Sequence, residues 1–99
     1  MKIEIEINGE LKEFESGKIN REKYNMWNET MEKVSDDLTN EDIIEMINCI
    51  VDIWNDQFTF EDVDKNLSLA EIVNYFINIG AEVRKEINTL QVENFMKAK

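Results

Sequence analysis

The sequence predicts an α+β fold in which an N-terminal β-hairpin packs on a small bundle of about four helices. Three observations lead to this expectation. Apolar and charged residues alternate at the start of the chain, apolar residues recur at helical spacing over the remainder, and helix-capping residues separate the helical stretches. A chain of 99 residues forms one domain and can bury a core without a disulfide or a structural metal.

The hairpin is predicted over residues 2–15. Isoleucine alternates with charged residues in its first strand, as expected for a strand with one buried face. Asn8-Gly9 follows and favours a type I′ turn, because both residues accept positive φ angles. A two-residue turn places Phe14 on the isoleucine face but Leu11 on the other, so the register stays open, with a β-bulge as the alternative.

The first two helices are predicted at about 20–35 and about 40–55. Asn20 is the expected N-cap of the first helix and Thr39 that of the second. The first helix carries one apolar stripe, which consists of Tyr24, Trp27, Met31, Val34 and then Leu38. The run Ile43–Trp54 is the most apolar stretch of the chain and is apolar most of the way round, so we expect the second helix at the centre of the core.

A short helix and a long helix are predicted at about 60–65 and about 69–88. Thr59 is the expected N-cap of the short helix, and Ser68 begins a capping box with the glutamate three residues later. One face of the long helix is formed by Leu69, Ile72, Val73, Phe76, Gly80, Val83 and Ile87. Glycine costs about 1 kcal/mol of helix propensity, so Gly80 on this face predicts the close approach of another backbone.

The apolar pattern of the last helix changes phase after Asn88. We therefore expect the domain to span residues 1–88 and residues 89–99 to form a separate C-terminal segment. Phe95 and Met96 lie in a small apolar cluster of this segment. The cluster leaves two interpretations open, a frayed end or a partner-binding segment.

The chain is strongly acidic, with a net charge of −11 from 22 acidic and 11 basic residues. Nucleic-acid binding depends on clustered Lys and Arg, and the basic residues form no such stripe, so we expect no nucleic-acid partner. The chain opens with alternating charge instead of a signal peptide's apolar segment, and no apolar run approaches the roughly 20 residues of a membrane span. These observations predict a cytoplasmic protein without a membrane partner, whose charge favours basic or amphipathic protein partners.

The sequence shows no recognisable site for catalysis or metal binding, and its plentiful carboxylates form no informative pattern. There is no histidine, the three glycines form no phosphate-binding loop, and Cys49 lies among isoleucines, where a buried thiol is expected. The segment 62–66 reads like the start of an EF-hand loop. However, Leu67 occupies the position that needs glycine and Val73 the position that needs a bidentate glutamate. We therefore predict no catalytic residues, no cofactor and no metal, and a protein that is not an enzyme.

The aromatic residues around the end of the second helix are the first candidates for partner binding. Trp54, Phe58 and Phe60 straddle this helix end, and a short helix cannot shield both phenylalanines from water. An aromatic patch with an acidic rim suits a protein partner. Together with Phe95 and Met96 these residues form the predicted partner-binding set, and core packing is the alternative for the first three.

The layout of the chain resembles a known family. A strand Lys-Ile-Glu-Ile-Glu-Ile-Asn-Gly opens the chain, and the segment Gln57–Val63 reads Gln-Phe-Thr-Phe-Glu-Asp-Val after the central helix. Over roughly residues 1–87 this arrangement resembles the tail assembly chaperones of long-tailed, siphovirus-like bacteriophages of Gram-positive bacteria. The chain has Asn66 where that family commonly has a glycine.

The resemblance implies a small non-enzymatic protein of the host cell cytoplasm that is absent from, or transient in, the mature virion. Such a protein binds the tape measure protein, keeps it soluble and leaves as tail-tube subunits polymerise around it. The tail-tube protein and a longer, frameshifted form of the chain are further partners that the resemblance implies.

Three other classes of function remain alternatives. An acidic phage inhibitor or DNA mimic would present carboxylates in phosphate-spaced rows, which the scattered acids do not show. A structural virion component would form a stable, symmetric interface between copies. An enzyme would need a pocket that holds titratable groups with perturbed pKa values.

Overall fold

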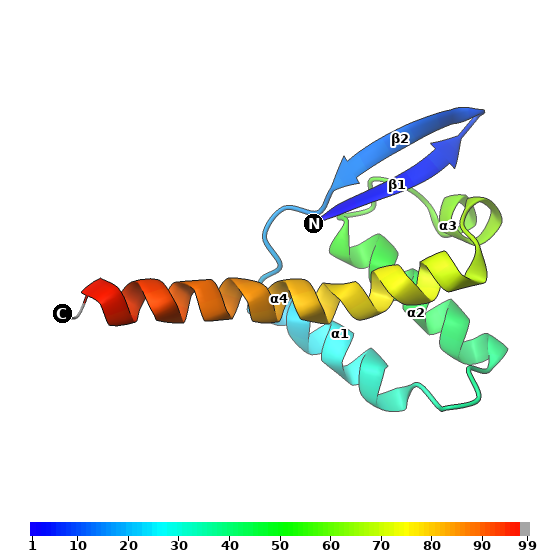
Figure 1. The fold of residues 1–99 in the computed structure, drawn as a ribbon. Helices are drawn as coiled ribbons and strands as arrows, with labels where there is room; N and C mark the ends of the chain where they lie inside the picture. The colour runs from blue at the N-terminus through cyan, green and yellow to red at the C-terminus, as the bar shows by residue number, and fades with distance from the viewer. Residues whose placement is uncertain (98–99) are drawn as a thin grey trace.

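The hairpin and the four helices expected from the sequence are all present in the computed structural model, which describes the backbone of residues 1–97 and the side chains of residues 1–90 (Figure 1). The α+β fold class is therefore confirmed. The elements are β1 (Lys2–Ile7), β2 (Glu10–Glu15), α1 (Arg21–Lys33), α2 (Asn40–Ile53), α3 (Phe60–Asn66) and α4 (Leu69–Lys97).

The hairpin is antiparallel and its register has no bulge. Ile7 pairs with Glu10 and Ile3 with Phe14, so Phe14 shares the isoleucine face. The two turn residues, Asn8 and Gly9, have φ angles of 53° and 80°, as a type I′ turn requires. Leu11 is left on the outer face, 69% exposed. The two-residue turn without a bulge is therefore correct, and it leaves the Leu11 side chain in solvent.

Helix α2 lies at the centre of the core. It packs against α1, α3 and α4, and α3 in turn packs on β1. Ile47, Ile50 and Trp54 have no exposed surface. The indole Nε1 of Trp54 donates a 3.1 Å hydrogen bond to the Phe14 carbonyl oxygen and so ties the end of α2 to the hairpin. The position predicted for the apolar run is thus confirmed.

Helices α1 and α4 meet where the Trp27 side chain lies on Gly80. A Cβ atom on Gly80 would lie 2.6 Å from Cζ2 of Trp27 and closer still to Cη2. The indole Nε1 of Trp27 donates a 2.8 Å hydrogen bond to the Phe76 carbonyl oxygen one turn earlier. The close approach at Gly80 is therefore that of a tryptophan ring, and the expectation of a second backbone was wrong, because the indole ring occupies the space that a Cβ atom would fill.

Helix α4 extends to Lys97, well beyond the predicted end near residue 88. The change of apolar phase does not stop the helix, because no glycine or proline follows Gly80 and the later residues are mostly good helix formers. Figure 1 shows that the C-terminal part of α4 projects past the rest of the fold. We call the part of α4 that follows Val83 the arm. The division of the chain into a domain and a tail stays a prediction.

The corner between α1 and α2 is closed by the Asp42 carboxylate. Its Oδ2 accepts hydrogen bonds from the Ser35 hydroxyl at 2.7 Å, from the Ser35 N–H at 3.2 Å and from the Thr39 N–H at 3.0 Å. The Asp42 N–H donates in return to the Thr39 hydroxyl, which completes a capping box. These bonds, led by that from the Ser35 hydroxyl, hold the pKa of the Asp42 carboxyl below its usual value.

We expect the substitution Gly80→Ala to destabilise the protein by about 1–2 kcal/mol, because the clash with the Trp27 ring outweighs the gain in helix propensity. The free energy of unfolding in urea measures the effect. Asn78→Ala, at an exposed position of the same helix, is the matched control and should be neutral or slightly stabilising. A Gly80→Ala variant more stable than the wild type would contradict the packing at this crossing.

We expect Asp42→Asn to lower the thermal midpoint at neutral pH, because a neutral amide is the weaker acceptor at this helix start. A lowered carboxyl pKa stabilises the fold above the ordinary aspartate pKa, and the gain is lost as the pH falls through the folded-state pKa. The difference in thermal midpoint between wild type and variant should therefore become smaller at acidic pH. Circular dichroism melts across a pH series test this, with exposed Asp37→Asn as the control. A gap that is constant with pH, or wider in acid, would refute it.

Candidate partner-binding surface

Two of the aromatic residues predicted to bind a partner are core residues. Trp54 is fully buried, Phe58 is 4% exposed, and only Phe60 is partly exposed. The hairpin covers them, because the Phe14 ring meets the Phe58 ring edge to face at a centroid distance of 5.1 Å. Trp54 and Phe58 therefore form no exposed patch, as the alternative of core packing expects, whereas Phe60 keeps the partial exposure expected for one of the two phenylalanines.

The other predicted binding residues stay a prediction. The side chains of Phe95 and Met96 lie outside the described residues, and a role in binding for Phe60 is not tested by its partial exposure. Sequence reasoning missed the covering of the helix end by the hairpin, because the register that places Phe14 on the inner face was left open.

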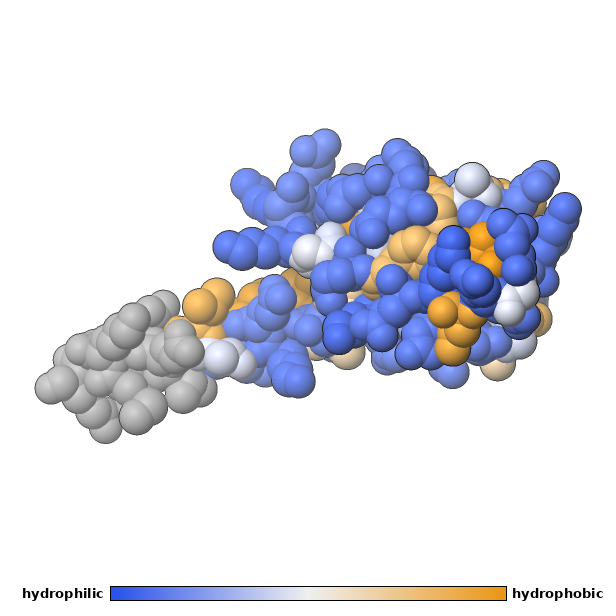
Figure 2. Space-filling view, turned by 90° about the horizontal axis from the view of Figure 1, so that it is seen from above, coloured by the Kyte–Doolittle hydropathy of each residue, from blue (hydrophilic) through white to orange (hydrophobic). Residues whose placement is uncertain are grey.

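Exposed apolar residues lie instead on the arm of α4. Among the residues of α4 whose side chains are described, Val83 is the last buried one, with 8% of its surface exposed. Beyond it Ile87 is 47% and Leu90 58% exposed, and their spacing of three puts them on one side of the helix. Figure 2 shows hydrophobic atoms on this part of the arm, whereas hydrophilic residues dominate the hairpin side of the molecule. An unshielded apolar stripe of this kind is typical of a protein-binding surface.

Among the side chains that the structure describes, the other exposed large apolar residues do not extend this stripe. They lie on the hairpin, at the α1–α2 corner and on the first half of α4, and are Leu11, Met31, Leu38, Ile44, Leu69 and Ile77. Single exposed apolar residues are ordinary on protein surfaces.

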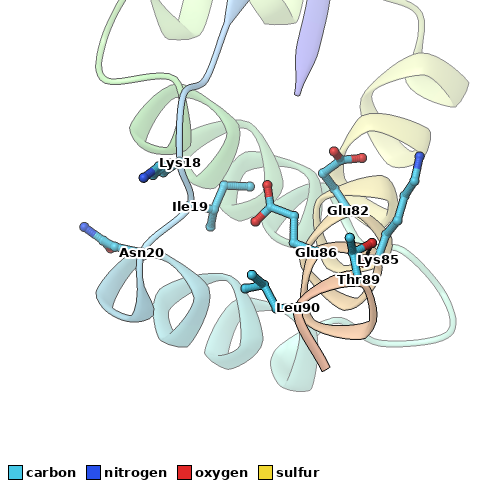
Figure 3. A pocket seen from close by; sticks show the side chains of 8 residues that line it. All are labelled: Lys18, Ile19, Asn20, Glu82, Lys85, Glu86, Thr89 and Leu90. Atoms are coloured by element: carbon cyan, nitrogen blue, oxygen red, sulfur yellow. Dashed lines mark hydrogen bonds between the residues drawn. The ribbon is translucent and has the colours of Figure 1, made fainter. Parts of the chain in front are cut away.

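A groove lies between the arm and the linker that joins the hairpin to α1. It has a volume of about 590 Å³ and is lined by Lys18, Ile19, Asn20, Glu82, Lys85, Glu86, Thr89 and Leu90. Figure 3 shows Ile19 and Glu86 pointing toward one another across it, with Leu90 beside them. Three consecutive residues of the linker thus line one side of the groove and two turns of α4 line the other, and Leu90 belongs both to the groove and to the exposed stripe of the arm.

The groove is lined by two acidic and two basic side chains, which differ in how they are directed. Glu82 is half-buried, and Glu86 follows one turn later on the same side of α4. Neither carboxylate is within ion-pairing distance of a basic group among the residues whose side chains are described. The ammonium groups of Lys18 and Lys85 point away from the groove (Figure 3). The interior is therefore apolar and acidic, with its basic residues turned outward.

The candidate reactive groups have structural roles. Cys49 is 3% exposed, and burial raises the pKa of its thiol to about 12. Asp62 of the EF-hand-like segment caps α3, because its Oδ2 accepts from the Thr59 N–H at 2.9 Å and its own N–H donates to the Thr59 hydroxyl at 3.1 Å. In the described part of the chain, no group of three or more His, Cys, Asp or Glu is placed to hold a metal ion.

Comparison with known proteins decides the family. The chain matches the sequence model of a family described as "Phage tail chaperone protein" over residues 1–99. It belongs to the phage tail chaperones. No curated protein and no solved structure matches it. The tail chaperone family shows that the chain acts in bacteriophage tail assembly on tail proteins, and the resemblance to tail assembly chaperones is confirmed over the whole chain.

Within residues 1–97, no helix of this tail chaperone is both long enough and apolar enough to cross a bilayer.

We expect Cys49 of the tail chaperone to react with a thiol reagent at least about a hundredfold more slowly in the native than in the unfolded protein, since the buried thiol must be exposed and ionised first. Mass spectrometry of timed labelling near pH 8 measures this. Asn78→Cys, introduced on the exposed face of α4 in a Cys49→Ala background, gives the labelling rate of an exposed thiol. Native labelling of Cys49 at that rate would show that the helix packing described here is wrong.

Proposed function

We propose that this tail chaperone binds the tape measure protein and keeps it soluble during tail assembly, without catalysing a reaction. The observation that carries the proposal is the arm of α4. It presents Ile87 and Leu90 beside an apolar groove on a chain with a net charge of −11. The family places the chain among proteins that act on tail proteins, and the tape measure protein is the tail protein with the greatest need of such a surface.

The physical basis of the proposal is the covering of apolar surface. A tape measure protein is a long, helical chain, and before assembly its apolar stripes are open to aggregation. The arm covers part of such a stripe through its own exposed residues. The negative charge then keeps the complexes apart, because like-charged particles repel one another. Tail-tube subunits that polymerise around the tape measure displace the chaperone.

The same proposal sets the place and the other partners of the chaperone. It acts in the host cell cytoplasm and is absent from, or transient in, the mature virion. The phage is a long-tailed phage of a Gram-positive host. The tail-tube protein then binds the tape measure surface that the chaperone had covered. A longer, frameshifted form of the chain shares the fold of the chaperone.

Co-expression with the tape measure protein of the same phage tests the proposal. We expect the tape measure to be soluble only with the chaperone and to be recovered with it by pull-down. The double variant Ile87→Asp/Leu90→Asp should reduce the soluble tape measure several-fold, because each charge sits where apolar contact is required. Both residues are exposed, so the variant keeps its fold, which circular dichroism verifies.

The matched control is Leu11→Asp/Leu69→Asp, which changes two leucines that are at least as exposed but lie away from the arm, and it should leave the solubility of the tape measure protein unchanged. A tape measure protein that is equally soluble, or equally insoluble, with and without the chaperone would refute the proposed function. Equal loss in both double variants would refute the assignment of the arm.

A further inference from the structure

We propose that the groove between the linker and α4 binds a basic amphipathic helix, whose apolar stripe lies on Ile19 and Leu90 and whose Lys or Arg side chains pair with Glu82 and Glu86. The proposal deepens the proposed function and rests on it for the source of this helix, a segment of the tape measure protein. The chemistry of recognition rests on the groove alone.

The α4 side of the groove presents a row of residues against which a helix can pack. Glu82, Glu86 and Leu90 are spaced by four residues and form a single ridge along two turns of α4. Two helices pack when the ridge of one enters the groove of the other, so a second helix can lie along this row with the linker on its far side. Ile19 projects from the linker toward that row and supplies the opposite apolar contact (Figure 3).

The charges select a basic partner. Glu82 and Glu86 are like charges one turn apart, which repel each other, and Glu82 is half-buried. Neither has an ion-pair partner among the described side chains, although Lys18 and Lys85 line the same groove. Because both ammonium groups point outward, the carboxylates remain available to an incoming cation. A helix with basic residues beside its apolar stripe supplies the missing charge.

The same features disfavour a second copy of the chain as the occupant. A two-fold contact through the groove would set the Glu82–Glu86 row of one copy near that of the other. Each copy also carries a net charge of −11, which opposes association. The occupant is therefore a partner of opposite charge.

Two synthetic helical peptides of about 20 residues provide the probe. They share one leucine stripe, which is flanked by lysines in one peptide and by glutamates in the other. Fluorescence anisotropy with the full chain measures both dissociation constants. We expect the lysine peptide to bind at least about tenfold more tightly and to weaken as salt is raised from about 50 to about 500 mM, because screening reduces charge pairing.

A charge swap makes the test specific to the groove. Glu82→Lys/Glu86→Lys should remove the preference for the lysine peptide and turn it toward the glutamate peptide. Glu6→Lys/Glu29→Lys changes the net charge equally at two exposed positions away from the groove and should keep the preference. Equal loss of preference in both variants would overturn the proposal and assign the attraction to net charge alone. No binding of the lysine peptide, or a dimer by sedimentation that the charge swap alters, would overturn it as well.

Co-expression separates this proposal from the proposed function. If the Glu82→Lys/Glu86→Lys variant solubilises the tape measure protein as well as the wild type, the chaperone function stands and the groove is not its recognition site. If the wild type fails to solubilise the tape measure, the chaperone function fails, and the peptide preference still decides whether the groove binds basic helices.

Discussion

The contact of Trp27 with Gly80 is the constraint on which the candidate surface depends. It joins α1 to α4 at one point, and the 2.8 Å hydrogen bond to the Phe76 carbonyl fixes the rotation of the indole. The linker enters α1 two turns before Trp27, so this crossing also sets the distance between the linker and the arm. A side chain larger than hydrogen at position 80 would therefore disturb both the core and the groove.

Helix α4 combines two roles along its length. Its first half belongs to the core, where Ile72, Phe76 and Ile79 are buried. The same apolar stripe continues at Ile87 and Leu90, which no other described element covers, so both side chains stay exposed. A continuous helix transmits its orientation from the packed half to the projecting half. The candidate surface on the arm is consequently held in place by the core, although it lies outside the core.

Local signals in the sequence were sufficient for much of the fold. The Asn8-Gly9 turn and the capping residue Thr39 act through neighbours within a few positions, so the hairpin and the helix starts could be predicted from the sequence. Features that depend on long-range packing could not. The burial of Phe58 depends on the hairpin register. The need for glycine at position 80 comes from the side chain of Trp27, which lies 53 positions earlier in the sequence. The groove was missed because the linker carries no periodic pattern that would place Ile19 against α4.

Three consecutive helices begin with the same device, a hydroxyl and a carboxylate that exchange hydrogen bonds across three residues. The pairs are Thr39 with Asp42, Thr59 with Asp62 and Ser68 with Glu71. Each closes a loop of four residues, which has a small entropic cost. By contrast, the hydrogen bond from the Glu4 N–H to the Tyr75 hydroxyl spans 71 residues. The helix starts are thus held by contacts that close short loops, whereas this contact of the hairpin with α4 closes a long loop, which has a larger entropic cost.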